Sequence, residues 1–391
     1  MVALTAIEQQ INPFPIYRDM RMQNPVYFDT QRFSWSVFRY EDVFRVLSDY
    51  NTFSSQYHQS NQGSIEQPFA SSMISTDPPR HRQLRTLVTQ AFTPRAVEAL
   101  APRIRSIVNE YLDKVIPGES MEVLHDLGNP LPVTVIAELM GIPVEDRDKF
   151  KQWSDKIVGL ADEGVMDFEY GRFDAAVMEM VTYFMNMIEL RRIHPGEDLI
   201  SGLLSAHLDD EFLSLPELMG FCVLLLVAGN ETTTNLIGNA MLTFIEHSGT
   251  WQRLRDQPEL LPAAIEEVLR YRSPVQCMFR HTRVDTTLGG KEIPAGESFL
   301  AWIGSANHDE DQFPDADRFI LDRSPNKHLA FGQGIHYCLG APLARLEAKI
   351  AFENMLERFS DVQMVPGTSI ERMPSLIVYG IRSLPVAFKK A

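Results

Sequence analysis

The sequence predicts a mainly α-helical fold with a minor β portion. Helical spacing of apolar residues dominates from Asp77 to about Lys349. Short apolar runs separated by glycine and proline lie near the N-terminus and again beyond Pro274, where strands are expected. The chain has 391 residues, 45% of them hydrophobic, and can bury a deep core around a sizeable ligand. Because no repeat or low-complexity linker interrupts it, residues 1–391 are expected to form a single domain.

The first elements are two strands and a loop. Residues 25–28 and 33–38 are predicted to form two short strands around a turn at 29–32, and the alternation of polar and apolar side chains over 34–37 supports this. Residues 54–72 are rich in glutamine and serine, which is typical of a long loop. Pro78 and Pro79 then favour the start of a helix.

The most legible helix begins at Ser214. Ser214 and Glu217 have the spacing of a capping box, and the helical pattern continues without a breaking residue to about His247, just before Gly249. The helix is therefore about 33 residues, or roughly 50 Å, long. Its first half is apolar on all sides, which predicts burial. Its middle, residues 230–234, is polar, and buried polar groups are costly unless they are paired or used.

After Pro274, we expect strands at residues 280–284, 286–288, 292–293 and 299–303. A helix is predicted over 341–359. The C-terminal part is expected to return to strand at 376–379 and 386–388.

Charge and cysteine content exclude several classes of function. The chain has 36 basic and 52 acidic residues, a net charge of −16, which repels a phosphate backbone and excludes nucleic acid as a primary partner. The three cysteines form no C-x-x-C pair, which favours a reducing cytoplasm and argues against a cysteine-built zinc site. No signal peptide is visible at the N-terminus, and the longest apolar run, 221–227, is short of the ~20 residues of a membrane helix. We therefore expect a cytoplasmic protein without a membrane anchor.

One segment, residues 331–340, has the pattern of a ligand-bearing loop. Gly332 and Gly334 permit tight turns before Cys338, and Pro342 opens a helix directly after it. A cysteine before a helix N-terminus is favoured as a thiolate, which suits an axial metal ligand. The alternative is a buried and inert cysteine, the commoner fate of a single thiol.

The full pattern F-x-x-G-x-H-x-C-x-G resembles the haem-binding loop of the cytochrome P-450 superfamily. Three further segments match in the expected order: residues 228–233, Glu267 with Arg270, and residues 317–319. In the last segment, the usual Pro-Glu before the arginine is replaced. The resemblance implies the cytochrome P-450 fold, with the long helix crossing a haem b (iron protoporphyrin IX), and Cys338 as the ligand of the iron.

The resemblance also implies roles for the polar middle of the long helix. Thr232 would hydrogen-bond the distal atom of dioxygen, and Glu231 would relay protons from solvent. The alternative is that residues 232–234 cap backbone groups and that Glu231 forms an outward ion pair.

Other matched residues would support the cofactor. Glu267, Arg270 and Arg318 would form a structural network behind the haem loop, and Phe331 would pack beside the thiolate. Four side chains would bind the haem propionates: His81, Arg85, Arg280 and His336. Six residues are candidate substrate contacts, although each could instead belong to the core: Phe69, Leu224, Ala228, Val275, Gln276 and Met278.

The resemblance thus implies a soluble, monomeric haem-thiolate monooxygenase that hydroxylates a lipophilic small molecule, such as a fatty acid, terpenoid or steroid, with dioxygen. Two electrons would come from NAD(P)H through a separate ferredoxin or flavodoxin and its reductase. A peroxide-driven peroxygenase and a non-enzymatic haem-based binding or sensing protein are alternatives, and the Glu231–Thr232 pair argues against both. An acidic electron donor is expected to dock on a basic face made by Arg95, Arg103, Arg105, Arg345 and Lys349.

Overall fold

The computed structural model describes most of the chain: residues 12–56, 72–89, 92–150, 152–153, 156, 175–208 and 211–391. The chain divides into two compact units. The first comprises Met1–Ser54, Ala101–Gly128 and Thr232–Ala391, and the second comprises Ser55–Leu100 and Asn129–Glu231.

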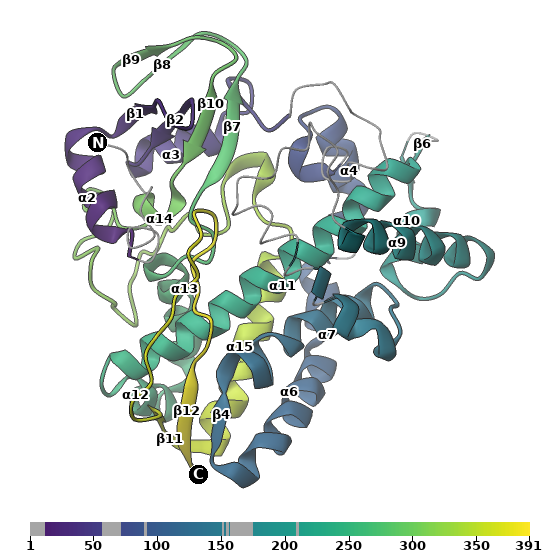
Figure 1. Ribbon diagram of the computed structural model, residues 1–391, viewed down its shortest axis with the longest axis vertical. Helices are drawn as coiled ribbons and strands as arrows, with labels where there is room; N and C mark the ends of the chain where they lie inside the picture. Colours follow the sequence, from purple (N-terminus) through teal and green to yellow (C-terminus); the bar gives the residue numbers. More distant parts are fainter. Residues whose placement is uncertain are drawn as a thin grey trace. The chain divides into compact units, whose positions relative to one another are not determined.

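The main sheet belongs to the first unit and has the strand order β1-β2-β10-β7-β3 (Figure 1). Its strands are β1 (Val26–Asp29), β2 (Ser34–Val37), β3 (Phe53–Ser54), β7 (Met278–Thr282) and β10 (Ser298–Ala301). The predicted N-terminal pair is confirmed as the antiparallel β1–β2 hairpin. β10 then pairs with β2 in parallel and with β7 antiparallel, so strands more than 240 residues apart in the sequence share one sheet.

One hydrophobic cluster lies between this sheet and α3 (Tyr40–Ser48). Val43, Val46 and Leu47 project from α3 toward Phe299 and Ala301 of β10. The remaining helices of the unit are α2 (Phe14–Gln23), α6 (Ala101–Val115), α12 (Thr250–Asp256), α13 (Leu261–Tyr271), α14 (Ile303–Ala306) and α15 (Ala341–Arg358).

Two smaller sheets complete the first unit. The hairpin β8 (Thr286–Leu288) and β9 (Lys291–Ile293) follows the prediction closely. The second is a three-stranded sheet of β4 (Ser120–Glu122), β11 (Phe359–Met364) and β12 (Pro385–Lys390), in the order β11-β12-β4.

In the described residues of the second unit, the regular elements are helices and one short hairpin. Its helices are α4 (Arg80–Thr89), α5 (Pro94–Glu98), α7 (Pro130–Leu139), α9 (Ala175–Ile193) and α10 (Leu199–Ser205), and its hairpin is β5 (His207–Leu208) with β6 (Glu211–Phe212). Most of the predicted loop at 54–72, including Phe69, lies outside the described residues.

The long helix, α11 (Leu215–Glu246), confirms the prediction within a residue at each end. The capping box is present: the Ser214 backbone N–H donates to Glu217 Oε2 at 2.9 Å, and the Glu217 N–H donates to Ser214 Oγ at 3.4 Å. The boundary between the two units falls inside this helix, between Glu231 and Thr232. Among the described residues, α11 is the one helix that is long and apolar enough to cross a membrane. The core helix of a soluble protein can meet the same criterion, and half of the most apolar 18-residue window of α11 is buried.

Several sequence-based boundaries were wrong. The strand predicted at 280–284 is β7, which begins and ends two residues earlier, at Met278–Thr282. The run at 299–303 is not all strand, because β10 ends at Ala301 and α14 begins at Ile303. Residues 376–379 form no strand ladder; Val378 makes a single isolated bridge to Val275. The strand β11 follows α15 without a break, and helical periodicity gave no signal for this change.

Candidate functional site

The cysteine loop connects a short 3-10 turn, Gly334–His336, to α15. The Cys338 backbone N–H donates to the Phe331 carbonyl at 2.9 Å, which closes the loop. Gly340 is the N-cap residue of α15. Of the three cysteines, Cys338 alone is exposed, whereas Cys222 and Cys277 are buried. Burial raises the pKa of Cys222 to about 12, so its thiol stays protonated.

The glycines of this loop are required by geometry. Gly332 and Gly334 have φ angles of +72° and +70°, which residues with a Cβ atom rarely adopt. A Cβ atom on Gly334 would also lie 2.9 Å from the Cα atom of Ser48 in α3. The loop therefore packs its backbone directly against a helix, and its path depends on both glycines.

Behind the loop, an ion pair joins α13 to α15. Arg345 Nε and Nη2 donate to the two carboxylate oxygens of Glu266 at 2.7 and 2.9 Å. His328 Nε2 lies 3.0 Å from Glu266 Oε2. Burial alone would raise the pKa of Glu266, but the hydrogen bonds from Arg345 and His328 outweigh burial and lower it to about 2. The pair is therefore ionised throughout the physiological range.

Arg345 also contacts the loop itself. Its guanidinium carbon lies 4.4 Å from the ring centroid of Phe331. Its Nη1 donates to the Tyr337 hydroxyl at 3.2 Å. Sequence reasoning missed this role and placed Arg345 on a docking surface; the i,i+7 spacing of Cys338 and Arg345 across a helix start gives no signal for it.

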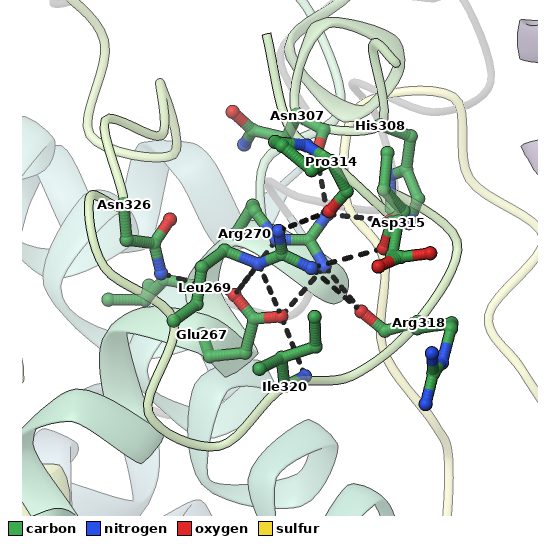
Figure 2. Close-up of polar contacts among 12 residues, drawn as sticks. Glu267, Leu269, Arg270, Asn307, His308, Pro314, Asp315, Arg318, Ile320 and Asn326 are labelled. Atoms are coloured by element: carbon green, nitrogen blue, oxygen red, sulfur yellow. Dashed lines mark hydrogen bonds and ion pairs between the residues drawn. The ribbon is translucent and has the colours of Figure 1, made fainter.

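A second carboxylate network confirms part of the predicted support (Figure 2). Arg270 Nη2 and Nε donate to Glu267 Oε1 and Oε2 at 2.8 and 2.9 Å, and both side chains are fully buried. The prediction for Arg318 was wrong. Its exposed side chain points away from the pair, and only its backbone carbonyl accepts a hydrogen bond from Arg270, at 2.9 Å.

The third member is Arg323, which lies five residues further along the chain. Its Nε is 3.0 Å from each oxygen of Glu267, and its side chain is only 6% exposed. Glu267 also accepts from the backbone N–H of Ile320 at 3.0 Å and from Asn326 Nδ2 at 3.2 Å. The irregular segment wraps around this carboxylate, so the arginine that reaches it is set by the path of the chain and not by the motif spacing.

The polar middle of α11 has mixed surroundings. Glu231 is 7% exposed, and Thr232 is half-buried. Thr234 Oγ1 donates to the Gly128 carbonyl at 2.9 Å and is therefore structural. On the N-terminal side, Leu224 is half-buried and Ala228 is exposed, which leaves both apolar side chains accessible to a ligand.

The predicted propionate contacts lie on several elements. His81 (2% exposed) and Arg85 are on α4 in the second unit. Arg280 (6% exposed) is on β7, and His336 is in the cysteine loop, both in the first unit. Their convergence on one cofactor stays a prediction.

Among the substrate candidates, Gln276 has a structural role. Its Oε1 accepts from the Tyr17 hydroxyl at 2.9 Å, and its Nε2 donates to the Ser273 carbonyl at 2.7 Å. Val275 and Met278 are half-buried and remain candidates.

The expected basic docking face is largely neutralised. Arg103 pairs with Glu110 at 3.2 Å, Arg105 with Glu353 at 2.7 Å, and Lys349 with Glu353 at 3.6 Å. Arg105 and Lys349 share the one carboxylate of Glu353, and Arg345 is paired with Glu266, so most of the predicted cations have an acidic partner. Docking of an acidic donor on the face that also includes Arg95 stays a prediction.

The donor set fits haem better than a bare metal ion. Among the residues that the structure describes, no three His, Cys, Asp or Glu side chains lie together as a metal site. One exposed cysteine before a helix N-terminus instead suits haem, in which the macrocycle supplies most of the iron's ligands and the protein would need to supply only a thiolate.

Comparison with known proteins decides the family. The model of the family "Cytochrome P450" matches residues 26–388. The chain belongs to the cytochrome P450 family. It is 42% identical to Cytochrome P450 109 of Bacillus spizizenii, over 99% of this chain and 94% of the relative. It is 40% identical to the cyclomarin C epoxidase CymV of Salinispora arenicola, over 95% of each chain.

The fold agrees with solved cytochrome P450 structures. The crystal structure of CYP109E1 from Bacillus megaterium in complex with testosterone superposes with a TM-score of 0.91 at 43% identity, covering 98% of this chain and 99% of that one. The predicted fold class is therefore confirmed. The chain is a cytochrome P450 monooxygenase, an oxidoreductase that uses haem, dioxygen, a small-molecule substrate and redox partners.

Proposed function

We propose that this cytochrome P450 hydroxylates a lipophilic small molecule of the fatty-acid, terpenoid or steroid type, in the cytoplasm and as a monomer. Electrons would come from NAD(P)H through a separate ferredoxin or flavodoxin and its reductase. The observation that carries the proposal is the exposed Cys338 in its glycine-dependent loop. Testosterone in the related CYP109E1 structure supports a steroid-sized apolar substrate.

Cys338 would bind the iron of haem b as a thiolate, held by its position before α15 and by the Phe331 carbonyl. The haem, when bound, supplies the iron that activates dioxygen. His81, Arg85, Arg280 and His336 would bind its propionates. Leu224, Ala228, Val275 and Met278 would offer apolar contacts to the substrate.

The Thr232 hydroxyl would donate a hydrogen bond to the distal atom of dioxygen, and the carboxyl of the largely buried Glu231 would deliver protons there. Thr232→Ala should retain haem and substrate binding but divert consumed NAD(P)H into hydrogen peroxide instead of hydroxylated product. Glu231→Gln should slow turnover by ~10²–10⁴-fold, because it removes the acid but keeps the shape.

Thr234→Ala is the matched control. It removes a threonine hydroxyl from the same helix, but this hydroxyl donates to the Gly128 carbonyl and has a structural role. Cofactor consumed, peroxide released and product formed should be measured in parallel for all three variants. Unchanged coupling in Thr232→Ala with normal turnover in Glu231→Gln would contradict the proposed proton route. Faster product formation with hydrogen peroxide alone than with redox partners would favour the peroxygenase alternative.

The ligand assignment has its own test. The ferrous carbon monoxide complex should show the red-shifted Soret band of a thiolate adduct, and Cys338→Ser should abolish that band. Cys222→Ser and Cys277→Ser should retain it, because both thiols are buried. Retention of the band in Cys338→Ser would refute the assignment.

A further inference from the structure

The Glu266–Arg345 ion pair contacts the segment that carries Cys338 at three residues. Arg345 stacks on Phe331 and donates to Tyr337, the residue before the cysteine. The backbone carbonyl of Phe331 in turn accepts a hydrogen bond from the Cys338 backbone N–H. On the other side of the pair, Glu266 binds His328, three residues before Phe331.

The hydrogen bonds of His328 define its protonation. Its Nδ1 accepts from the Ala330 backbone N–H at 3.2 Å, so this nitrogen carries no proton. The Nε2 therefore holds the proton and donates it to Glu266. A neutral imidazole adds no charge, so the cluster consists of one cation and one anion that cancel.

We propose that Glu266 and Arg345 are positioning residues for the thiolate loop. We propose also that the balance between their opposite charges sets the reduction potential of the iron, so that removing either charge shifts it. This inference rests on the proposed ligation of the iron by Cys338. The two side chains have separable contributions. The planar guanidinium holds the loop through stacking and a two-pronged carboxylate contact, whereas the net charge of the pair acts on the iron through space.

The charge contribution predicts shifts of opposite sign. Arg345→Gln leaves the Glu266 carboxylate uncompensated, which disfavours the gain of an electron at the iron. Glu266→Gln leaves the guanidinium uncompensated, which favours it. We expect the ferric-to-ferrous equilibrium constant to fall about threefold or more in the first variant and to rise about threefold or more in the second. The double variant should lie near the wild type.

The loop-holding contribution is tested by Arg345→Lys, which keeps the charge but loses the planar fork. Its potential should stay close to that of the wild type. Its ferrous carbon monoxide complex should lose the red-shifted Soret band several-fold faster on mild warming. Arg253→Gln is the matched control, because the exposed Arg253–Asp322 pair, 2.7 Å apart, is an arginine–carboxylate pair that makes no contact with the loop.

The experiment is spectroelectrochemical titration of the substrate-free holoenzymes, with the carbon monoxide spectrum recorded for each. Shifts of the same sign in both single variants, or no shift in either, would overturn the inference. If Arg345→Gln gives no soluble holoenzyme, a potential of Glu266→Gln at or below the wild-type value overturns it equally. A wild-type spectrum without the red-shifted band would instead refute the ligation by Cys338.

Discussion

Two adjacent glutamates of α13, Glu266 and Glu267, bind different segments of the chain and differ in burial. Glu267 is fully buried and receives hydrogen bonds from Arg270, Arg323 and the segment around them. Glu266 is partly exposed and binds Arg345 and His328, which hold the cysteine loop. Because successive side chains on a helix point about 100° apart, one turn of α13 presents a carboxylate to each of two irregular segments.

A third carboxyl, that of the buried Glu347 of α15, has neither kind of partner in the described part of the chain. Its side chain is 1% exposed, and its Oε2 finds no hydrogen-bond donor among the residues that the structure describes. Burial raises its pKa to about 8. Two of these three carboxyls thus stabilise the fold as anions, whereas the third is protonated at neutral pH.

The largest effect is expected from Glu267→Gln. This variant removes the anion from two buried arginines, so it should lower the free energy of unfolding by about 3–5 kcal/mol. Urea unfolding followed by far-ultraviolet circular dichroism measures this change. A loss below about 1 kcal/mol would place Glu267 in the same class as an exposed ion pair.

Glu347→Gln should have the opposite sign. Its pKa rises from 4.5 to about 8 on folding, so the wild type loses stability as pH increases between these values. The amide does not titrate and should be more stable than the wild type by about 3 kcal/mol at pH 7, but by less than about 1 kcal/mol at pH 5. Urea unfolding at both values provides the test, and a pH-independent difference would contradict it.

Arg323 and Arg318 form a matched pair that tests which arginine completes the network. Arg323→Gln should cost about 1–3 kcal/mol, because its charged hydrogen bonds to Glu267 are buried. Arg318→Gln should stay within about 0.5 kcal/mol of the wild type, because only its backbone carbonyl is used. The reverse order would restore the assignment made from the motif.

Of the ion pairs, the smallest effect is expected at the exposed Arg253–Asp322 pair, whose side chains are 45% and 51% exposed. Asp322→Asn should change the unfolding free energy by less than about 1 kcal/mol, and 0.5 M salt should erase the difference. A larger or salt-resistant change would show that this exposed ion pair contributes to the unfolding free energy as the less exposed pairs of Glu266 and Glu267 do.

Local signals were sufficient for much of the fold. The capping box at Ser214 located the start of α11, and alternation located the β1–β2 hairpin. The glycine pattern located the cysteine loop because Gly332 and Gly334 are required by their backbone angles. Each of these features depends on residues that are close together in the sequence.

Contacts between distant segments were not predictable in the same way. Arg323 reaches Glu267 across 56 positions, and Arg345 reaches Glu266 across 79. The amide of Gln276 is used by Tyr17, 259 positions away, which no spacing rule indicates. Such partners are selected by the path of the chain in three dimensions. A motif therefore indicates that an arginine binds the glutamate, but it does not determine which arginine along the chain does so.

The parallel pairing of β2 with β10 has a consequence during synthesis. Trp35 pairs with Phe299, so the first hairpin leaves the ribosome about 260 residues before its neighbouring strand. At roughly 5–20 residues per second, the edge of β2 waits about 13–50 s with unsatisfied backbone groups. Slow codons or a truncated message in that interval would prolong the exposure of the unpaired β2 edge on the nascent chain. A chaperone or another nascent chain can then pair with this edge before β10 is synthesised.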